Sequence, residues 1–165
     1  MDGACLSEKF LAWVARAGWV TSRFDDEGEF DDEGNCAIWQ EDAQGRTVTS
    51  YLLHAKEDDW FEVEDGDARR AMFSARGLET VERYFWGFLA GAIRKKTSLP
   101  ETATPERPAA GYRIEDGLVD PSGAVVARGD EHYLVALSHY LVPTLEALEA
   151  ALLHPEGKPL FTTKG

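Results

Sequence analysis

The sequence has few of the features that mark membrane, secreted or metal-binding proteins. Its 165 residues contain no apolar run of about 18 residues, the length that a membrane-spanning helix needs. The first residues, 1–5, show neither the basic region nor the apolar core of a secretory signal. The two cysteines, Cys5 and Cys36, are too few for a disulfide framework and lack metal-ligand spacing. We therefore expect a bacterial-type cytoplasmic protein that binds neither a membrane nor a metal.

Motifs of the common enzyme classes are also missing. The sequence holds no glycine-rich phosphate loop, dinucleotide fingerprint, nucleophile elbow or zinc-protease helix. Ser138 and His139 are adjacent, but neighbouring helix residues point about 100° apart and make a poor catalytic dyad. The glycines near the acidic residues do not give the ligand spacing of an EF-hand calcium loop. We therefore expect no cofactor and a binding function; an acidic hydrolase with paired carboxylates is the enzymatic alternative.

Acidic charge is plentiful and unevenly distributed. The net charge is −13, from 30 acidic and 17 basic residues. Residues 1–67 carry the whole imbalance, which gathers in two runs, 25–33 and 57–67. Such a field repels nucleic acids and anionic membranes and attracts a basic partner. Solvated loops that serve only solubility would have the same composition.

The hydrophobic pattern predicts an α+β fold with an antiparallel sheet, formed by a single domain over residues 1–165. Strands are expected over 19–24, 37–40, 46–54 and 60–64, and a hairpin over 112–128. Helices are expected over 6–17, 78–94 and 130–141, with a further one after Pro143. Short strands joined by tight turns favour antiparallel pairing.

The segment 78–94 is predicted to be the central helix of the fold. One apolar stripe is widened by further aromatic residues, so most sides of this helix should be buried on the sheet, with the two C-terminal helices beside it. The stripe consists of Leu78, Val81, Phe85, Phe88 and Ala92. The residues that follow, 98–110, contain three prolines and no apolar period, which predicts an extended surface connection.

Three stretches, taken together in their order and spacing, resemble the immunity protein 61 family. They are the aromatic helix 81–91, the hairpin 118–126, and a C-terminal pair comprising 137–141 and 156–161. The resemblance implies an antitoxin rather than an enzyme. It further implies that the partner is a toxin domain that hydrolyses NAD, whose active site the immunity protein blocks in a 1:1 complex inside the producing cell.

Two exposed segments are candidates for the contact with such a toxin. A site that binds the pyrophosphate of NAD is expected to be electropositive, so acidic residues would be attracted to its mouth. The first set therefore comprises Asp25, Asp26, Glu27, Asp31, Asp32 and Glu33. The second set lies on the connection 100–112, whose prolines lower the entropic cost of insertion; it comprises Glu101, Glu106, Arg107 and Tyr112. A different basic toxin, such as a nuclease, is the alternative partner.

Overall fold

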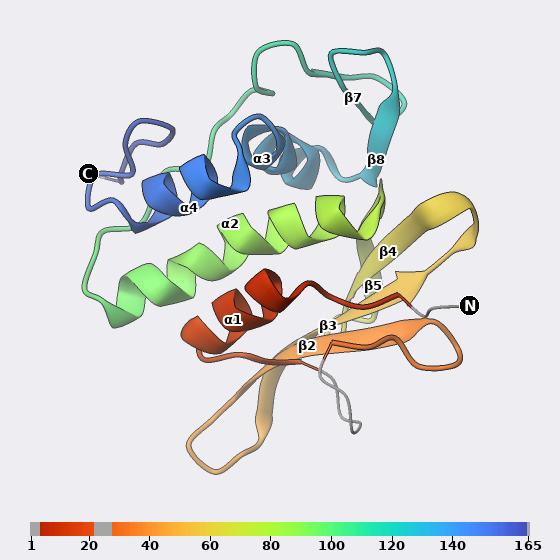
Figure 1. The fold of residues 1–165 in the computed structure, drawn as a ribbon, viewed down its shortest axis with the longest axis vertical. Coiled ribbons are helices and arrows are strands. Elements are labelled where there is room, and N and C mark those ends of the chain that lie inside the picture. Colours follow the sequence, from red (N-terminus) through yellow and green to blue (C-terminus); the bar gives the residue numbers. More distant parts are fainter. Residues whose placement is uncertain (1–3, 22–27, 165) are drawn as a thin grey trace.

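The chain folds into an antiparallel sheet with helices packed on its inner face (Figure 1). The computed structural model describes residues 4–21 and 28–164. In chain order the elements are α1 (Glu8–Arg16), β1 (Val20–Thr21), β2 (Asn35–Glu41), β3 (Thr47–Ala55), the 3-10 turn η1 (Glu57–Asp59), β4 (Trp60–Asp65), β5 (Arg70–Arg76), α2 (Leu78–Lys96), β6 (Arg113–Ile114), β7 (Leu118–Val119), β8 (Val125–Gly129), α3 (Glu131–Leu141) and α4 (Leu145–Leu153).

The sheet has eight strands in the order β1-β2-β3-β4-β5-β8-β7-β6. Every neighbouring pair is antiparallel, which confirms the predicted α+β fold. Strands β1 to β5 follow one another in sequence, and β8 pairs with β5 after the chain has passed through α2. The predicted turn 120–123 is present, since the Gly123 N–H donates to the Asp120 carbonyl at 2.9 Å.

Helix α2 is the centre of the core, as its apolar pattern predicts. Val81, Phe85 and Leu89 are at most 1% exposed. Helix α1 packs against α2 through Trp13, whose ring centroid lies 4.2 Å from that of Trp86. The indole N–H of Trp13 also donates to the Trp86 carbonyl at 3.1 Å. Burying a large apolar side chain contributes about 1.5–3 kcal/mol, so this layer is a major part of the stability.

The predicted burial of Phe88 is wrong, because its side chain is 36% exposed. The ring lies beside Trp19 and Tyr51 on the sheet side and beside Tyr84 on its own helix. The apolar surface of α2 is wider than the area that the sheet and the other helices cover. Phe88 lies at the margin of that area, and helical periodicity alone does not show where the cover ends.

Strand β5 is absent from the sequence prediction. Its exposed positions are arginine and alanine, residues that do not favour strands. Met72 and Phe73 are both buried, which breaks the expected alternation. The cause is a register shift opposite Val63 and Glu64 in β4.

Candidate functional site

The acidic residues 31–33 form the turn that leads into β2. The Asp31 carboxylate accepts hydrogen bonds from the backbone N–H groups of Glu33 (3.0 Å) and Asn35 (2.8 Å). This carboxylate therefore holds the turn, as aspartate often does. All three residues, 31–33, are exposed. The other acidic residues predicted to contact a toxin lie outside the described residues: Asp25, Asp26 and Glu27.

The structure brings this turn next to the second acidic run. Strand β3 ends at Ala55, whose N–H donates to the Gly34 carbonyl at 2.7 Å, and η1 follows directly. The juxtaposition depends on the register of the β2–β3 hairpin, in which Asn35 faces His54. The sequence pattern locates both strands but not this register. We define the acidic edge as Asp31, Asp32, Glu33, Glu57, Asp58 and Asp59.

Within the acidic edge, η1 has an unusual backbone. Asp58 and Asp59 have φ values of 56° and 62°, the left-handed region that few residues other than glycine adopt. The carbonyl of Asp59 accepts a hydrogen bond from the Gly77 N–H (2.7 Å), which ties the turn to the start of α2. Strained exposed turns of this kind cluster at functional sites. The carboxylates of η1 are thus displayed on a fixed backbone.

The outer face of the sheet, next to the acidic edge, carries a tryptophan whose ring is contacted by two arginines. The guanidinium carbons of Arg76 and Arg128 lie 5.4 Å and 4.8 Å from the Trp60 ring centroid. The three residues come from β5, β8 and β4, which are adjacent in the sheet. Such cation–π contacts hold the arginines along the surface. This face is therefore of mixed charge, a feature that the sequence pattern does not reveal.

The connection 100–112 is held against the protein along its length. At one end the Ala103 N–H donates to the Thr162 carbonyl at 2.7 Å. Further along, the Ala109 N–H donates to the buried Ser138 hydroxyl at 2.9 Å. Inserting the segment into a cleft would require these bonds to break, so its role as a contact stays a prediction.

Two of the predicted contact residues on this connection have structural partners. Glu101 pairs with Lys164 at 2.9 Å, and that contact lowers the pKa of the carboxyl. Tyr112 is half-buried against the core, and burial raises its pKa. Glu106 and Arg107 remain exposed. In Figure 1 the connection passes over α3, away from the strand end that carries the acidic edge, so the two predicted sets do not form one surface.

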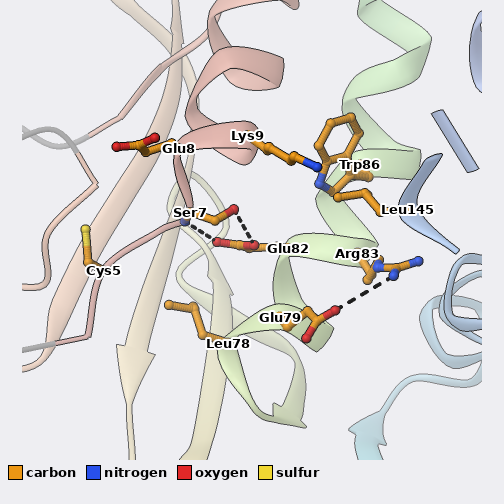
Figure 2. Close-up of a pocket in the computed structure, with 10 residues that line it drawn as sticks. All are labelled: Cys5, Ser7, Glu8, Lys9, Leu78, Glu79, Glu82, Arg83, Trp86 and Leu145. Carbon is orange, nitrogen blue, oxygen red and sulfur yellow. Dashed lines mark hydrogen bonds and ion pairs between the residues drawn. The ribbon is translucent and has the colours of Figure 1, made fainter.

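A hollow of about 560 Å³ opens where α1, α2 and α4 meet (Figure 2). Glu82 accepts hydrogen bonds from the backbone N–H (2.6 Å) and hydroxyl (2.9 Å) of Ser7, the residue that caps α1. Arg83 donates to the Pro143 carbonyl at 2.8 Å and lies 3.7 Å from Glu79. The charged groups at its centre therefore join the helices to one another.

The Glu82 carboxyl of the hollow has a perturbed acidity. Burial raises its pKa despite the hydrogen bonds from Ser7, whose hydroxyl also caps α1. The thiol of Cys36 lies outside the hollow and is buried. Burial raises the pKa of this thiol to about 12 and keeps it protonated. Across residues 4–21 and 28–164, no cluster of three side chains could hold a metal ion. In the same residues, no helix combines the length and apolar character needed to cross a bilayer.

Comparison with known proteins gives consistent matches along the chain. Residues 13–160 match the family described as immunity protein 61. The immunity factor for TNT of Mycobacterium tuberculosis and its homolog in Mycobacterium bovis are each 28% identical to this chain over 176 aligned positions, covering 97% of it and 94% of the relative. A solved structure, Rv3902c from M. tuberculosis, superposes with a TM-score of 0.82 at 27% identity, covering 99% of this chain and 97% of that one. The chain therefore belongs to the immunity protein 61 family, as the resemblance of its aromatic helix, hairpin and C-terminal segments predicts.

Proposed function

We propose that this immunity protein binds a cognate toxin domain that hydrolyses NAD and occludes the active site of that domain. The observation that carries the proposal is the match with immunity factors for TNT along nearly the whole of both chains. Because the match covers nearly the whole length of both chains, it concerns the complete fold rather than one segment. We extend the kind of partner from these relatives to this protein on that ground.

The inhibition is stoichiometric rather than enzymatic. The described residues offer no metal cluster, and the polar groups of the hollow in Figure 2 are engaged in holding helices together. A protein without catalytic machinery can neutralise an enzyme only by staying bound to it. We therefore propose a 1:1 complex without a cofactor, formed in the cytoplasm of the producing cell, with a dissociation constant in the nanomolar range or below, equivalent to about −12 kcal/mol.

The acidic edge supports a partner with a basic active-site mouth. It places Asp32, Glu33 and the three acids of η1 at one end of the sheet. An enzyme that binds a dinucleotide needs positive potential near the pyrophosphate, and complementary charge accelerates the encounter of two proteins. The edge therefore supports fast capture of the toxin.

A nuclease toxin is the second candidate partner, because the same acidic edge suits it. Nucleases also present a basic surface to their substrate. The charge of this protein therefore favours a basic target without choosing between the two enzymes. The similarity to the immunity factor for TNT favours a toxin related to TNT as the partner.

The decisive experiment titrates the immunity protein into the purified cognate toxin domain. NAD consumption should fall linearly to zero at one equivalent, and the immunity protein alone should consume no NAD. A matched acidic protein of unrelated fold serves as the control for non-specific charge effects. Undiminished NAD hydrolysis, with nucleic-acid cleavage blocked instead, would transfer the proposal to the nuclease.

A further inference from the structure

The guanidinium groups of Arg76 and Arg128, on the outer face of the sheet, have no acidic partner. Both side chains are exposed. Across residues 4–21 and 28–164 neither guanidinium forms an ion pair or a hydrogen bond; each contacts the Trp60 ring, whose centroid lies 5.4 Å and 4.8 Å from their central carbons. Stacking on a ring leaves the N–H donors of a guanidinium unused. Both groups can therefore donate to a group outside the protein.

The register of the sheet brings the two arginines to one ring. Trp60 lies directly opposite Arg76 in the β4–β5 ladder. Arg128 lies opposite Ser74, which shares a face with Arg76 because the two are separated by one residue of β5. Long side chains reach such diagonal neighbours. Strands β4, β5 and β8 thus gather one aromatic ring and two positive charges on the outer face of the sheet.

The Trp60 ring holds the two guanidiniums in place although their charges repel each other. The ring is half-buried, which limits its own motion. An anion bound beside the arginines would offset the repulsion between two positive charges so close to one ring. Side chains that are positioned before binding lose less entropy when a ligand arrives. The arrangement therefore favours an anionic ligand.

The nearest acids on this face pair with other residues. Glu62, which follows Trp60 on the outer face of β4, pairs with Lys56 at 3.8 Å. Glu64, the next residue on that face, pairs with His54 at 3.1 Å. The chain has 30 acidic residues against 17 basic ones, so the lack of a partner reflects the position of the arginines and not a shortage of carboxylates.

The surroundings favour the carboxylate of a protein over a polyanion. The acidic edge lies directly beside this site, because Asp59 of that edge precedes Trp60 in the chain. The Asp59 carbonyl also accepts a hydrogen bond of 2.7 Å from Gly77, the residue after Arg76. The edge repels the linked phosphates of a nucleic acid or a dinucleotide. A single carboxylate matches the planar fork of a guanidinium and carries only one charge.

We infer that Trp60, Arg76 and Arg128 form an anchor that receives acidic side chains of the toxin. The carboxylates of the toxin accept hydrogen bonds from the two guanidiniums, and neighbouring apolar atoms cover the part of the Trp60 ring that is exposed. The acidic edge beside this arginine anchor faces the basic mouth of the active site. Adjacent surfaces of opposite charge fix the orientation in which the toxin docks. The inference rests on the proposed function and adds a second contact to it.

The first test measures binding of the purified toxin domain by calorimetry. Arg76→Gln and Arg128→Gln should each weaken binding about ten-fold, and Arg128→Lys only about three-fold, because it keeps the charge but loses the fork of donors. The direction is informative. Both glutamine variants make the protein more acidic, which would strengthen binding to a basic toxin if net charge alone mattered.

The matched control is Arg16→Gln in α1, a helix on the other face of the sheet. Arg16 is also exposed and also stacks on a tryptophan, since its guanidinium carbon lies 5.8 Å from the Trp13 ring centroid. This variant removes the same charge and the same kind of contact and should leave the dissociation constant unchanged. Equal affinities of the wild type, Arg76→Gln and Arg128→Gln would overturn the inference.

A cross-linking experiment identifies the occupant of the arginine anchor. A carbodiimide couples an amine to a carboxylate in contact with it, so Arg128→Lys mixed with the toxin should give a product that joins position 128 to an aspartate or glutamate of the toxin. Arg16→Lys serves as the control and should give no such product. Coupling of position 128 to a second copy of this chain, or only to carboxylates of its own chain, would overturn the inference.

The outcomes separate the two proposals. A wild-type protein that inhibits the toxin, together with anchor variants of equal affinity, would overturn the arginine anchor and leave the proposed function standing. A wild-type protein that does not bind the toxin would overturn both. Melting temperatures exclude unfolding as the cause of weaker binding, because Arg76→Gln and Arg128→Gln alter exposed side chains and should change the melting temperature little.

Discussion

The guanidinium of Arg94, in the last turn of α2, donates a hydrogen bond of 2.7 Å to the carbonyl of Leu152, near the end of α4. The same group donates to the carbonyls of His154, Pro155 and Pro100 at 2.7–2.8 Å. Arg94 is only 1% exposed. Carbonyls at a helix end lack partners within the helix, and this one side chain supplies donors for several of them. Arg94 thereby joins α2, the end of α4 and the start of the connection 100–112.

Replacing Arg94 should therefore destabilise the fold. Arg94→Ala should lower the free energy of unfolding by about 3–5 kcal/mol, because buried carbonyls would lose charged donors. Arg94→Lys should recover only part of this, since one ammonium does not reproduce the fork of guanidinium donors. Urea denaturation measures both. Lys95→Ala, on the exposed neighbour, is the control and should stay within about 0.5 kcal/mol of the wild type; an equal effect of the two alanine variants would contradict this role.

Arg94 also shows which parts of the fold the sequence predicts. Helical periodicity locates α2, and a cation at its C-terminus matches the helix dipole there. Periodicity does not show that Arg94 is buried while Lys95 and Lys96 are exposed, because that depends on where residues 152–155 return. Local signals such as the 120–123 turn were sufficient for the hairpin, whereas a packing partner distant in sequence was not predictable.

The candidate site was less predictable than the fold for the same reason. Composition reveals that the acids concentrate in residues 1–67, but the acidic edge forms through the register of β2 and β3. The partial exposure of Phe88 likewise depends on helix packing, which leaves this ring at the margin of the covered surface of α2.

Glu82 should make stability depend on pH. Burial raises the pKa of its carboxyl in the folded state, so the folded protein binds a proton more readily than the unfolded chain does. The stability that this group contributes is complete below its unfolded pKa of about 4.3 and declines as pH rises through the higher folded pKa. Glu82→Gln removes this titration. The free energy of unfolding of the wild type relative to Glu82→Gln should therefore fall as the pH is raised from about 4 towards neutrality.

Urea denaturation of both proteins across that range provides the measurement. Glu131→Gln, on an exposed residue of α3, also removes one acidic group and serves as the control. A difference between wild type and Glu82→Gln that increases with pH would mean that the bonds from Ser7 outweigh the cost of burial.

Phe85 and Phe88 should behave differently when truncated. Phe85 is completely buried, so Phe85→Ala should cost about 3–5 kcal/mol of stability and abolish inhibition by unfolding the protein. Phe88→Ala removes a ring that is 36% exposed and should cost about 1–2 kcal/mol. It should retain a cooperative melting transition. Thermal denaturation distinguishes the two effects; a Phe88→Ala variant as unstable as Phe85→Ala would contradict the position of Phe88 at the margin of the core.

The acidic edge should control the rate at which the toxin is captured. Asp31 is left unchanged because its carboxylate holds the turn, so the variant combines Asp32→Asn, Glu33→Gln, Glu57→Gln and Asp58→Asn. Asparagine tolerates the left-handed backbone of position 58. Association at low salt should slow by roughly ten-fold, with a smaller change in dissociation, because rim charges act mainly on encounter.

Salt dependence separates steering from a general effect of net charge. The effect of the variant should shrink with added salt, since the screening length falls from about 30 Å at 0.01 M to about 10 Å at 0.1 M. A control variant removes four acids elsewhere, at Glu115, Asp116, Glu146 and Glu149, and has the same net charge. Stopped-flow measurements should show little slowing for this control. Equal slowing of both variants would assign the effect to the total charge of the protein. An unchanged association rate for the edge variant would mean that the acidic edge is a solvated surface that does not steer the toxin.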